Sequence, residues 1–230
     1  MTLSKRNRTT PGFLFGLLLI LSSCSSGATK PPSPSKEEKV NPENLVLSKR
    51  VTVSFDSLRN THILYGQDST AAQWTTSFDT IQCVVGYNGI APPGLKREGD
   101  GKTPAGEFPL GLVFGYENDL EIAEDFLDLE PYHYWISDSE SSKYNTLVDY
   151  NPAPAEAEKM ERNDHLYKYG IIIEYNTETV VPGMGSAIFI HIYRSPDRPT
   201  AGCVGIAESD IIALIKWLQG SEVTTINIID

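Results

Sequence analysis

Cysteine and histidine are scarce in this sequence, and neither recurs at a metal-binding spacing. Of the 230 residues, three are cysteine and four are histidine, and no HxxxH or CxxC pair occurs. Zinc sites commonly use such closely spaced pairs, so we expect no metal centre. We also expect no nucleotide or other cofactor. The stretch GDGKT at 99–103 resembles a phosphate-binding loop, but Lys96 stands where that pattern needs glycine, and Pro104 and Pro109 preclude the helix that should follow.

Internal repeats and long apolar runs are also missing. No fixed repeat period emerges along the chain, which excludes a solenoid or a propeller. The apolar run at 13–21 (FLFGLLLIL) is too short to span a bilayer, and no second long run follows it, which argues against a transmembrane helix. Eleven tyrosines and eighteen glycines instead favour a fold of strands and turns.

Basic residues are outnumbered by acidic ones, 19 to 30. Residues 1–24 hold three of the basic residues and none of the acidic ones, so the remainder has 16 against 30, a net charge of −14. Such a charge disfavours binding to nucleic acid or to anionic lipid headgroups. It is compatible with a cationic or zwitterionic substrate.

The N-terminus is typical of an exported lipoprotein. A basic stretch at 5–8 precedes the apolar run, and the sequence LSSC at 21–24 is similar to a bacterial lipobox. We therefore interpret 1–24 as a lipoprotein signal peptide and Cys24 as the lipidated residue, whose acyl chains anchor the protein to a membrane. The alternative is an ordinary signal peptide with an incidental cysteine.

Residues 25–42 are small, polar and proline-rich, which indicates a flexible tether ahead of a folded domain at 43–230. Ser25 is not the aspartate associated with inner-membrane retention. We therefore expect an exported cell-envelope protein, on the periplasmic face of the outer membrane if the cell has one. Export also raises the question of a disulfide, because Cys83 and Cys203 would share an oxidising compartment.

The folded part is predicted to be a single mainly-β domain. Seven segments are rich in β-branched and aromatic residues and read as strands. They are 45–55, 61–66, 77–87, 106–116, 169–176, 185–193 and 223–230.

Two helices are predicted beside these strands. One covers 208–220, with Ser209 as its N-cap and Gly220 at its end, and a short acidic one covers 118–129. The segment 133–168 is long and weakly patterned, so it forms either a lid or substrate wall or a surface excursion.

His191 and Cys203 are candidates for a catalytic pair. His191 lies near the end of the apolar stretch AIFIHIY, and Cys203 follows twelve residues later, after a polar loop. A strand and a return of the chain would bring an imidazole beside a thiol, where histidine can take the thiol proton or pair with the thiolate. Gly202 would let the backbone approach a substrate carbonyl, and N–H groups around it could hold an oxyanion. The alternatives are a structural histidine, and a cysteine that is structural or bonded to Cys83.

Around this pair the chain resembles a known family. HIYRSPDRPTAGCV resembles the active-site motif of the YkuD-type L,D-transpeptidases, which pair a histidine with a downstream [Ser/Thr]-x-Gly-Cys. Residues 84–116 are similar to the family's glycine-rich block, and 135–148 and 164–176 resemble segments of one divergent branch. The resemblance covers 81–218. It implies a mainly-β catalytic domain, a sandwich or mixed sheet with one C-terminal helix and a long lid-like loop.

The resemblance also implies a cysteine acyltransferase that acts on peptidoglycan stem peptides. Cys203 would attack the amide between the third residue and the terminal D-alanine of a tetrapeptide stem. The acyl group would then pass to a neighbouring stem as a 3→3 cross-link. In this scheme His191 is the general base, Gly202 contributes to the oxyanion hole and Thr200 orients the site. The family orients its histidine with a backbone carbonyl, so no acidic third member is expected.

Six further residues lie in the resembling segments and are candidates for substrate binding, with a structural role open for each. They are Arg97, Lys102, Trp135, Tyr144, Asn145 and His165.

The sequence also departs from the family pattern. The spacing from histidine to Gly-Cys is shorter than in the main branch, Ala201 replaces a second histidine, and Gly205 replaces arginine or asparagine. These differences leave the substrate and the acceptor open. The alternatives are an L,D-carboxypeptidase or other amide hydrolase of the same fold, and a non-catalytic peptidoglycan-binding module with a Cys83–Cys203 disulfide. We expect a monomer.

Overall fold

The computed structural model describes residues 48–230 except 71–72, 117–119, 121–125 and 151–152. The expected signal peptide, its lipidated Cys24 and the tether at 25–42 lie outside these residues. No helix in the described part of the chain is long and apolar enough to cross a membrane.

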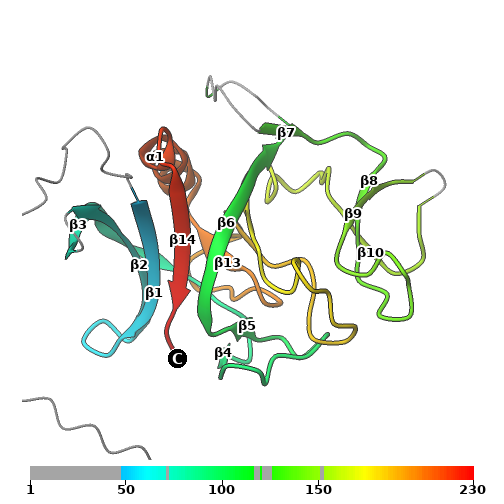
Figure 1. Cartoon of the computed structure of the whole chain (residues 1–230), viewed down its shortest axis with the longest axis horizontal. Helices are drawn as coiled ribbons and strands as arrows, with labels where there is room; N and C mark the ends of the chain where they lie inside the picture. The colour runs from blue at the N-terminus through cyan, green and yellow to red at the C-terminus, as the bar shows by residue number, and fades with distance from the viewer. Residues whose placement is uncertain (1–47, 71–72, 117–119, 121–125, 151–152) are drawn as a thin grey trace, which may run out of the picture. The chain divides into compact units, whose positions relative to one another are not determined.

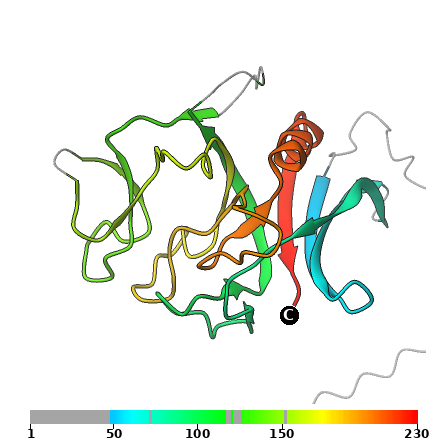
Figure 2. The same cartoon turned by 180° about the vertical axis from the view of Figure 1, so that it is seen from behind.

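Nine strands of the described residues form one mixed sheet (Figures 1 and 2). They are β1 (Ser48–Asp56), β2 (Thr61–Thr70), β3 (Gln73–Cys83), β6 (Gly106–Gly115), β7 (Phe126–Asp128), β11 (Tyr169–Ile173), β12 (Phe189–Ile192), β13 (Val204–Ile206) and β14 (Val223–Ile228). Their order is β13-β12-β11-β6-β14-β1-β2-β3, and β7 pairs with β6. The C-terminal strand β14 therefore lies inside the sheet, parallel to β1 and antiparallel to β6.

The segment 133–168 has a small sheet of its own, to one side of the large one (Figure 1). It consists of β8 (His133–Ile136), β9 (Leu147–Asp149) and β10 (Ala157–Lys159), with β8 in the middle. A further pair of short strands, β4 (Ile90–Ala91) and β5 (Thr103–Pro104), lies within the glycine-rich block.

The helix α1 (Glu208–Leu218) follows β13 and packs its Ile211, Leu214 and Ile215 into the core. Its apolar residues recur at helical spacing, as the sequence predicts. The predicted cap is wrong, because Ala207 occupies the N-cap without a side-chain hydrogen bond and Ser209 lies inside the helix. Gly220 follows the helix with φ +71°, a left-handed conformation that glycine adopts without steric cost.

The second predicted helix, at 118–129, is wrong where it can be compared. Residues 126–128 form the strand β7, which pairs in parallel with β6, and most of the remaining segment lies outside the described residues. Pairing with an existing strand satisfies the backbone of these residues, and this tertiary contact overrides a weak local preference for helix. The prediction of a mainly-β fold with a C-terminal helix is confirmed.

Buried side chains form two clusters, and each contains one cysteine. The larger cluster, here called the aliphatic core, lies between the large sheet and α1, is rich in isoleucine, leucine and valine, and includes Cys83. The smaller one, here called the aromatic cluster, includes Cys203 and packs residues of 133–168 against β6, β11 and β12. Its aromatic members are Phe114, Trp135, Tyr167 and Phe189.

Candidate active site

The strand β12 places His191 beside the aromatic cluster, on the same face of the strand as Phe189. Its neighbours Ile190 and Ile192 point into the aliphatic core, while Phe189 belongs to the aromatic cluster, as expected from the alternation of side chains along a strand. β12 pairs in parallel with β13, with His191 opposite Gly205. The connection between the two strands therefore carries the chain back beside β12, and Cys203 lies directly before β13.

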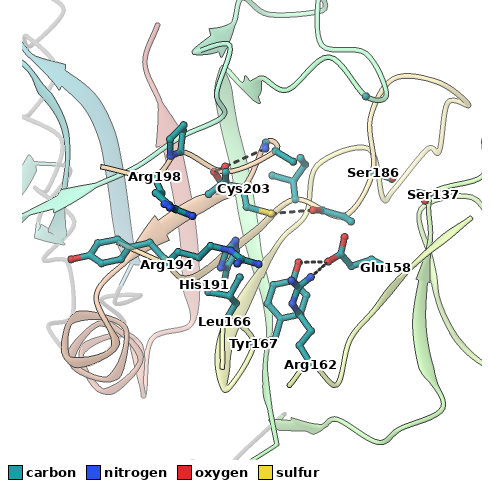
Figure 3. Close-up of a pocket in the computed structure, with 18 of the residues that line it drawn as sticks. Ser137, Glu158, Arg162, Leu166, Tyr167, Ser186, His191, Arg194, Arg198 and Cys203 are labelled. Atoms are coloured by element: carbon teal, nitrogen blue, oxygen red, sulfur yellow. Dashed lines mark hydrogen bonds and ion pairs between the residues drawn. The ribbon is translucent and has the colours of Figure 1, made fainter. Parts of the chain in front are cut away.

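All four predicted catalytic residues line one cavity of about 440 Å³. Figure 3 shows His191 and Cys203 at this cavity, and Thr200 and Gly202 line it as well. The rest of the wall comes from the glycine-rich block, from 133–168, from the segment before β12 and from the connection between β12 and β13. These residues include Lys96, Glu98, Ser137, Glu158, Arg162, Tyr167, Ser186 and Ala187. The fold thus brings residues that are distant in sequence to one concave site.

His191 has a defined tautomer. Its Nδ1 lies 2.8 Å from the carbonyl oxygen of Ile192, and a carbonyl accepts hydrogen bonds without donating any, so Nδ1 carries the proton. Nε2 is then the nitrogen with a free lone pair, which can accept a proton. The Tyr167 ring packs edge-on against the imidazole with ring centroids 5.2 Å apart. The backbone thus takes the orienting role that a carboxylate has in many catalytic triads.

The Cys203 thiol is buried and donates a hydrogen bond to the backbone. Its Sγ lies 3.2 Å from the carbonyl oxygen of Ala187 (Figure 3). Burial raises the pKa of Cys203 to about 12, although a hydrogen bond from the Phe189 N–H favours the thiolate. Burial also lowers the pKa of His191 to about 4. At neutral pH the pair is therefore an uncharged thiol and an uncharged imidazole.

Thr200 and Gly202 shape the turn that carries the nucleophile. The Thr200 hydroxyl accepts a hydrogen bond from the Gly202 N–H at 3.1 Å and donates one to the Cys203 carbonyl at 2.6 Å. Gly202 has φ +156°, and a Cβ there would lie 3.0 Å from the Lys102 carbonyl oxygen, so the close approach of the two segments requires glycine. In this conformation the Gly202 N–H is used by Thr200 and does not point to an oxyanion.

A protein-family comparison agrees with this geometry. The model of the YkuD family, described as the L,D-transpeptidase catalytic domain, matches residues 48–228. The chain belongs to the YkuD family. Searches of curated proteins and of solved structures gave no match.

Three of the predicted substrate-binding residues of this YkuD domain lie behind the cavity wall. Trp135, Tyr144 and Asn145 are all buried, and none of them lines the cavity. The Trp135 indole N–H donates to Asn145 Oδ1 at 2.8 Å, and its ring packs on Phe189. The Tyr144 hydroxyl donates to Glu98 at 2.5 Å. These contacts support the wall instead of facing a substrate, so a structural role fits them better than the predicted binding role.

The other three candidates lie around the cavity without lining it. The exposed Arg97 donates to the carbonyls of Gly94 and Lys96 and so braces its own loop. Lys102 meets the active-site turn through its backbone carbonyl. His165 is exposed and lines a shallower neighbouring hollow.

The structure adds a charged network that the sequence did not reveal. Arg162 donates to Glu158 at 2.5 Å and to Asp164, and Asp164 also accepts from Arg194 at 2.9 Å. The hydrogen bonds from Arg162 lower the pKa of Asp164 to about 2. Glu158 further accepts from the Tyr167 hydroxyl, which connects the network to the ring that packs on His191. Only Arg194 could have been noticed in the sequence, because it lies within the family motif. The other residues of this network are spread over the weakly patterned segment 133–168.

Neither a disulfide nor a metal site is present in the part of the chain that the structure describes. Cys83 and Cys203 are both free thiols, in different clusters, which contradicts the disulfide alternative. No group of three or more His, Cys, Asp or Glu side chains among these residues has a metal-binding arrangement.

Proposed function

We propose that this YkuD-family protein is an L,D-transpeptidase in which Cys203 is the nucleophile and His191 the general base. The observation that supports this most is the pair itself. A free thiol and an imidazole with an unprotonated Nε2 line one cavity, on a wall whose backbone fixes both side chains. This arrangement supports acyl transfer through a thioester.

The proposed reaction begins with two neutral groups. As Cys203 Sγ attacks the carbonyl carbon of the L,D amide, its proton passes to His191 Nε2 and a C–S bond forms. The imidazolium then protonates the amide nitrogen, the C–N bond breaks and D-alanine leaves. An amine of a second stem attacks the thioester, His191 takes its proton, and the thiol is released with a 3→3 cross-link formed. Before attack the S–H hydrogen must turn from Ala187 to His191 by rotation about the Cβ–Sγ bond, which leaves Sγ in place, since this hydrogen points to Ala187 in the resting enzyme.

The charges around the cavity favour a peptide with free carboxylates. The acidic wall residues Glu98 and Glu158 are each engaged by two side chains within the protein. Arg198 and Arg194, which also donates to Asp164, are exposed at the cavity, on the connection between the two catalytic residues (Figure 3). Arginine is well suited to carboxylates because its guanidinium can donate two parallel hydrogen bonds. We infer that these two arginines hold stem carboxylates. Gly205, which stands where the family pattern has arginine or asparagine, has no side chain to do so.

The experiment is an assay of the purified full chain with a disaccharide-tetrapeptide, analysed by mass spectrometry. Transfer yields D-alanine and 3→3 dimers, whereas the alternative carboxypeptidase yields D-alanine and tripeptides alone. Cys203→Ala is the matched control and should form neither. If the wild type releases no D-alanine, the proposal is wrong and the non-catalytic binding module is favoured.

We further propose that Cys24 is lipidated and that the protein is tethered to a membrane of the cell envelope. The sequence LSSC at 21–24 after the short apolar run supports this proposal. Intact-mass analysis of the protein from membranes tests it: diacylglycerol on a chain that begins at residue 24 is expected. Cys24→Ala should leave the signal peptide uncleaved or the protein unlipidated.

A further inference from the structure

Ala187 has an unusual backbone conformation at the nucleophile. Its φ is +52°, in the left-handed region, which costs a residue with a Cβ about 1–2 kcal/mol. Strain of this kind persists where the surroundings hold it in place. The conformation has a direct consequence for the site, because the Ala187 carbonyl oxygen accepts the hydrogen bond from Cys203 Sγ at 3.2 Å.

Asn145 supplies the contact that holds Ala187. It is 3% exposed, and its Oδ1 accepts hydrogen bonds from the Ala187 N–H at 3.0 Å and from the Trp135 indole at 2.8 Å. Its Nδ2 donates to the carbonyls of Tyr175 at 3.0 Å and Asn176 at 2.8 Å. Every hydrogen-bonding position of this amide is thus used within the protein, so the side chain has one defined orientation.

We propose that Asn145 is a positioning residue for the nucleophile: it holds Ala187 in the left-handed conformation that presents its carbonyl to the Cys203 thiol. Asn145 comes from 133–168 and does not line the cavity, so it acts through Ala187 without touching a substrate. The segment 133–168 then sets the orientation of the thiol in addition to forming the wall of the site. The effect on turnover rests on the proposed function, whereas the effect on the thiol does not.

Asn145→Gly is the direct test, made in the full chain. Asn145 itself has φ +56°, which glycine adopts freely, so this change removes the amide without straining its own backbone. We expect kcat to fall about tenfold or more with KM within about twofold, because the nucleophile is misplaced while no residue that lines the cavity is changed. We also expect iodoacetamide to alkylate Cys203 about threefold faster or more at pH 8, since the thiol loses its fixed acceptor.

Two internal controls separate positioning from loss of fold. Cys83 is 1% exposed in the aliphatic core, so its labelling reports unfolding of the domain, and we expect it to stay unlabelled. Asn60 has a similar φ of +52° in the exposed turn after β1, and Asn60→Gly should leave kcat and alkylation unchanged.

A second substitution makes the test specific to Ala187. Glycine adopts a positive φ without being held, so adding Ala187→Gly to Asn145→Gly should restore kcat by about threefold or more. General destabilisation would gain nothing from a second glycine. If Asn145→Gly does not fold, Asn145→Ala, which also removes the Oδ1 that accepts from the Ala187 N–H, takes its place in the same cycle with the same expectations.

The proposal is overturned if the Asn145 variant keeps wild-type kcat and wild-type Cys203 alkylation, or if Ala187→Gly fails to restore what was lost. It is also overturned if Cys83 is labelled as fast as Cys203. Alkylation needs no peptide, so faster labelling of Cys203 alone supports the positioning role even if the wild type releases no D-alanine. That result would reject the proposed function and keep this inference.

Discussion

Cys83 and Cys203 each have a histidine close by, yet their surroundings differ. Cys83 lies directly opposite His62 in the antiparallel register of β2 and β3, while Cys203 shares a cavity with His191. Burial raises the pKa of both thiols to about 12, so the pKa does not distinguish them. What differs is access and partners: Cys83 packs in the aliphatic core, whereas Cys203 faces a cavity and has a fixed backbone acceptor. A neighbouring histidine alone therefore does not identify a cysteine as part of a candidate active site.

The largest expected effect comes from removing each cysteine in turn. Cys203→Ala should lower turnover about 10³-fold or more, because no other group forms the thioester. Cys83→Ala should leave turnover within about twofold and lower the free energy of unfolding by about 1 kcal/mol through the small cavity it creates. D-Alanine release and urea denaturation measure the two quantities. Equal loss of turnover in both variants would remove the distinction between the two thiols.

The next effect tests whether the packing of the aliphatic core affects stability without affecting turnover at the candidate active site. Leu214 of α1 is fully buried, and Leu214→Ala should lower the free energy of unfolding by about 2–5 kcal/mol. We expect kcat of the folded fraction to stay within about twofold, because α1 contributes nothing to the cavity wall. Leu58, which is 97% exposed, provides the matched control, and Leu58→Ala should change stability by less than about 0.5 kcal/mol. A large fall in kcat for Leu214→Ala would contradict the separation.

The third effect is a pH dependence of stability. Burial lowers the pKa of His191 to about 4, below the 6.5 expected in the unfolded chain. Between these values the unfolded state binds more protons, so the free energy of unfolding falls as the pH drops from 6.5 towards 4. We expect it to be about 2 kcal/mol lower at pH 5 than at pH 7, measured by urea denaturation.

His191→Gln should remove most of this difference between pH 5 and pH 7. Burial also lowers the pKa of His62, which adds a contribution of the same sign. His62→Gln is therefore the control, and it should keep the contribution of His191. An unchanged pH dependence in His191→Gln would show that His191 is not the buried neutral base described above.

The smallest effect concerns the charges at the cavity. Arg198→Gln should raise KM for a tetrapeptide with free carboxylates about tenfold, equivalent to about 1.4 kcal/mol, with little change in kcat. The rise should be smaller for a stem whose carboxylates are amidated. Arg59→Gln, in the exposed turn after β1, is the control and should leave KM unchanged. An equal rise for both substrates would contradict carboxylate binding.

The sequence allowed good prediction where one local signal was strong. The apolar residues around His191 indicated a strand, and the segment 200–203 was identified through its family motif. The mainly-β class and α1 followed from composition and periodicity. The predicted N-cap at Ser209 and the predicted helix over 126–128 were wrong. Local preferences for helix are weak, and tertiary contacts, such as the pairing of 126–128 with β6, override them.

The residues that support the candidate active site from behind could not be predicted, for a different reason. Trp135, Tyr144 and Asn145 were singled out by resemblance as candidates for substrate binding, with a structural role left open, and their polar groups are used within the protein. Their role depends on which backbone groups they meet, such as the Ala187 N–H, and these partners are distant in sequence. The network of Glu158, Arg162 and Asp164 is likewise assembled from irregular segments that have no periodic signal.

The position of β14 has a consequence for how the domain folds. Residues 223–228 lie between β1 and β6, and the two halves of the large sheet also meet at the bridge between Val84, directly after β3, and Gly205 of β13. Ser48, at the start of the described chain, pairs with Val223 near its end. The contacts that join β1 to β14 are therefore among the most distant in sequence, and contacts of this kind slow folding. A chain that lacks this strand leaves β1 and β6 with open edges, the kind of surface that promotes aggregation.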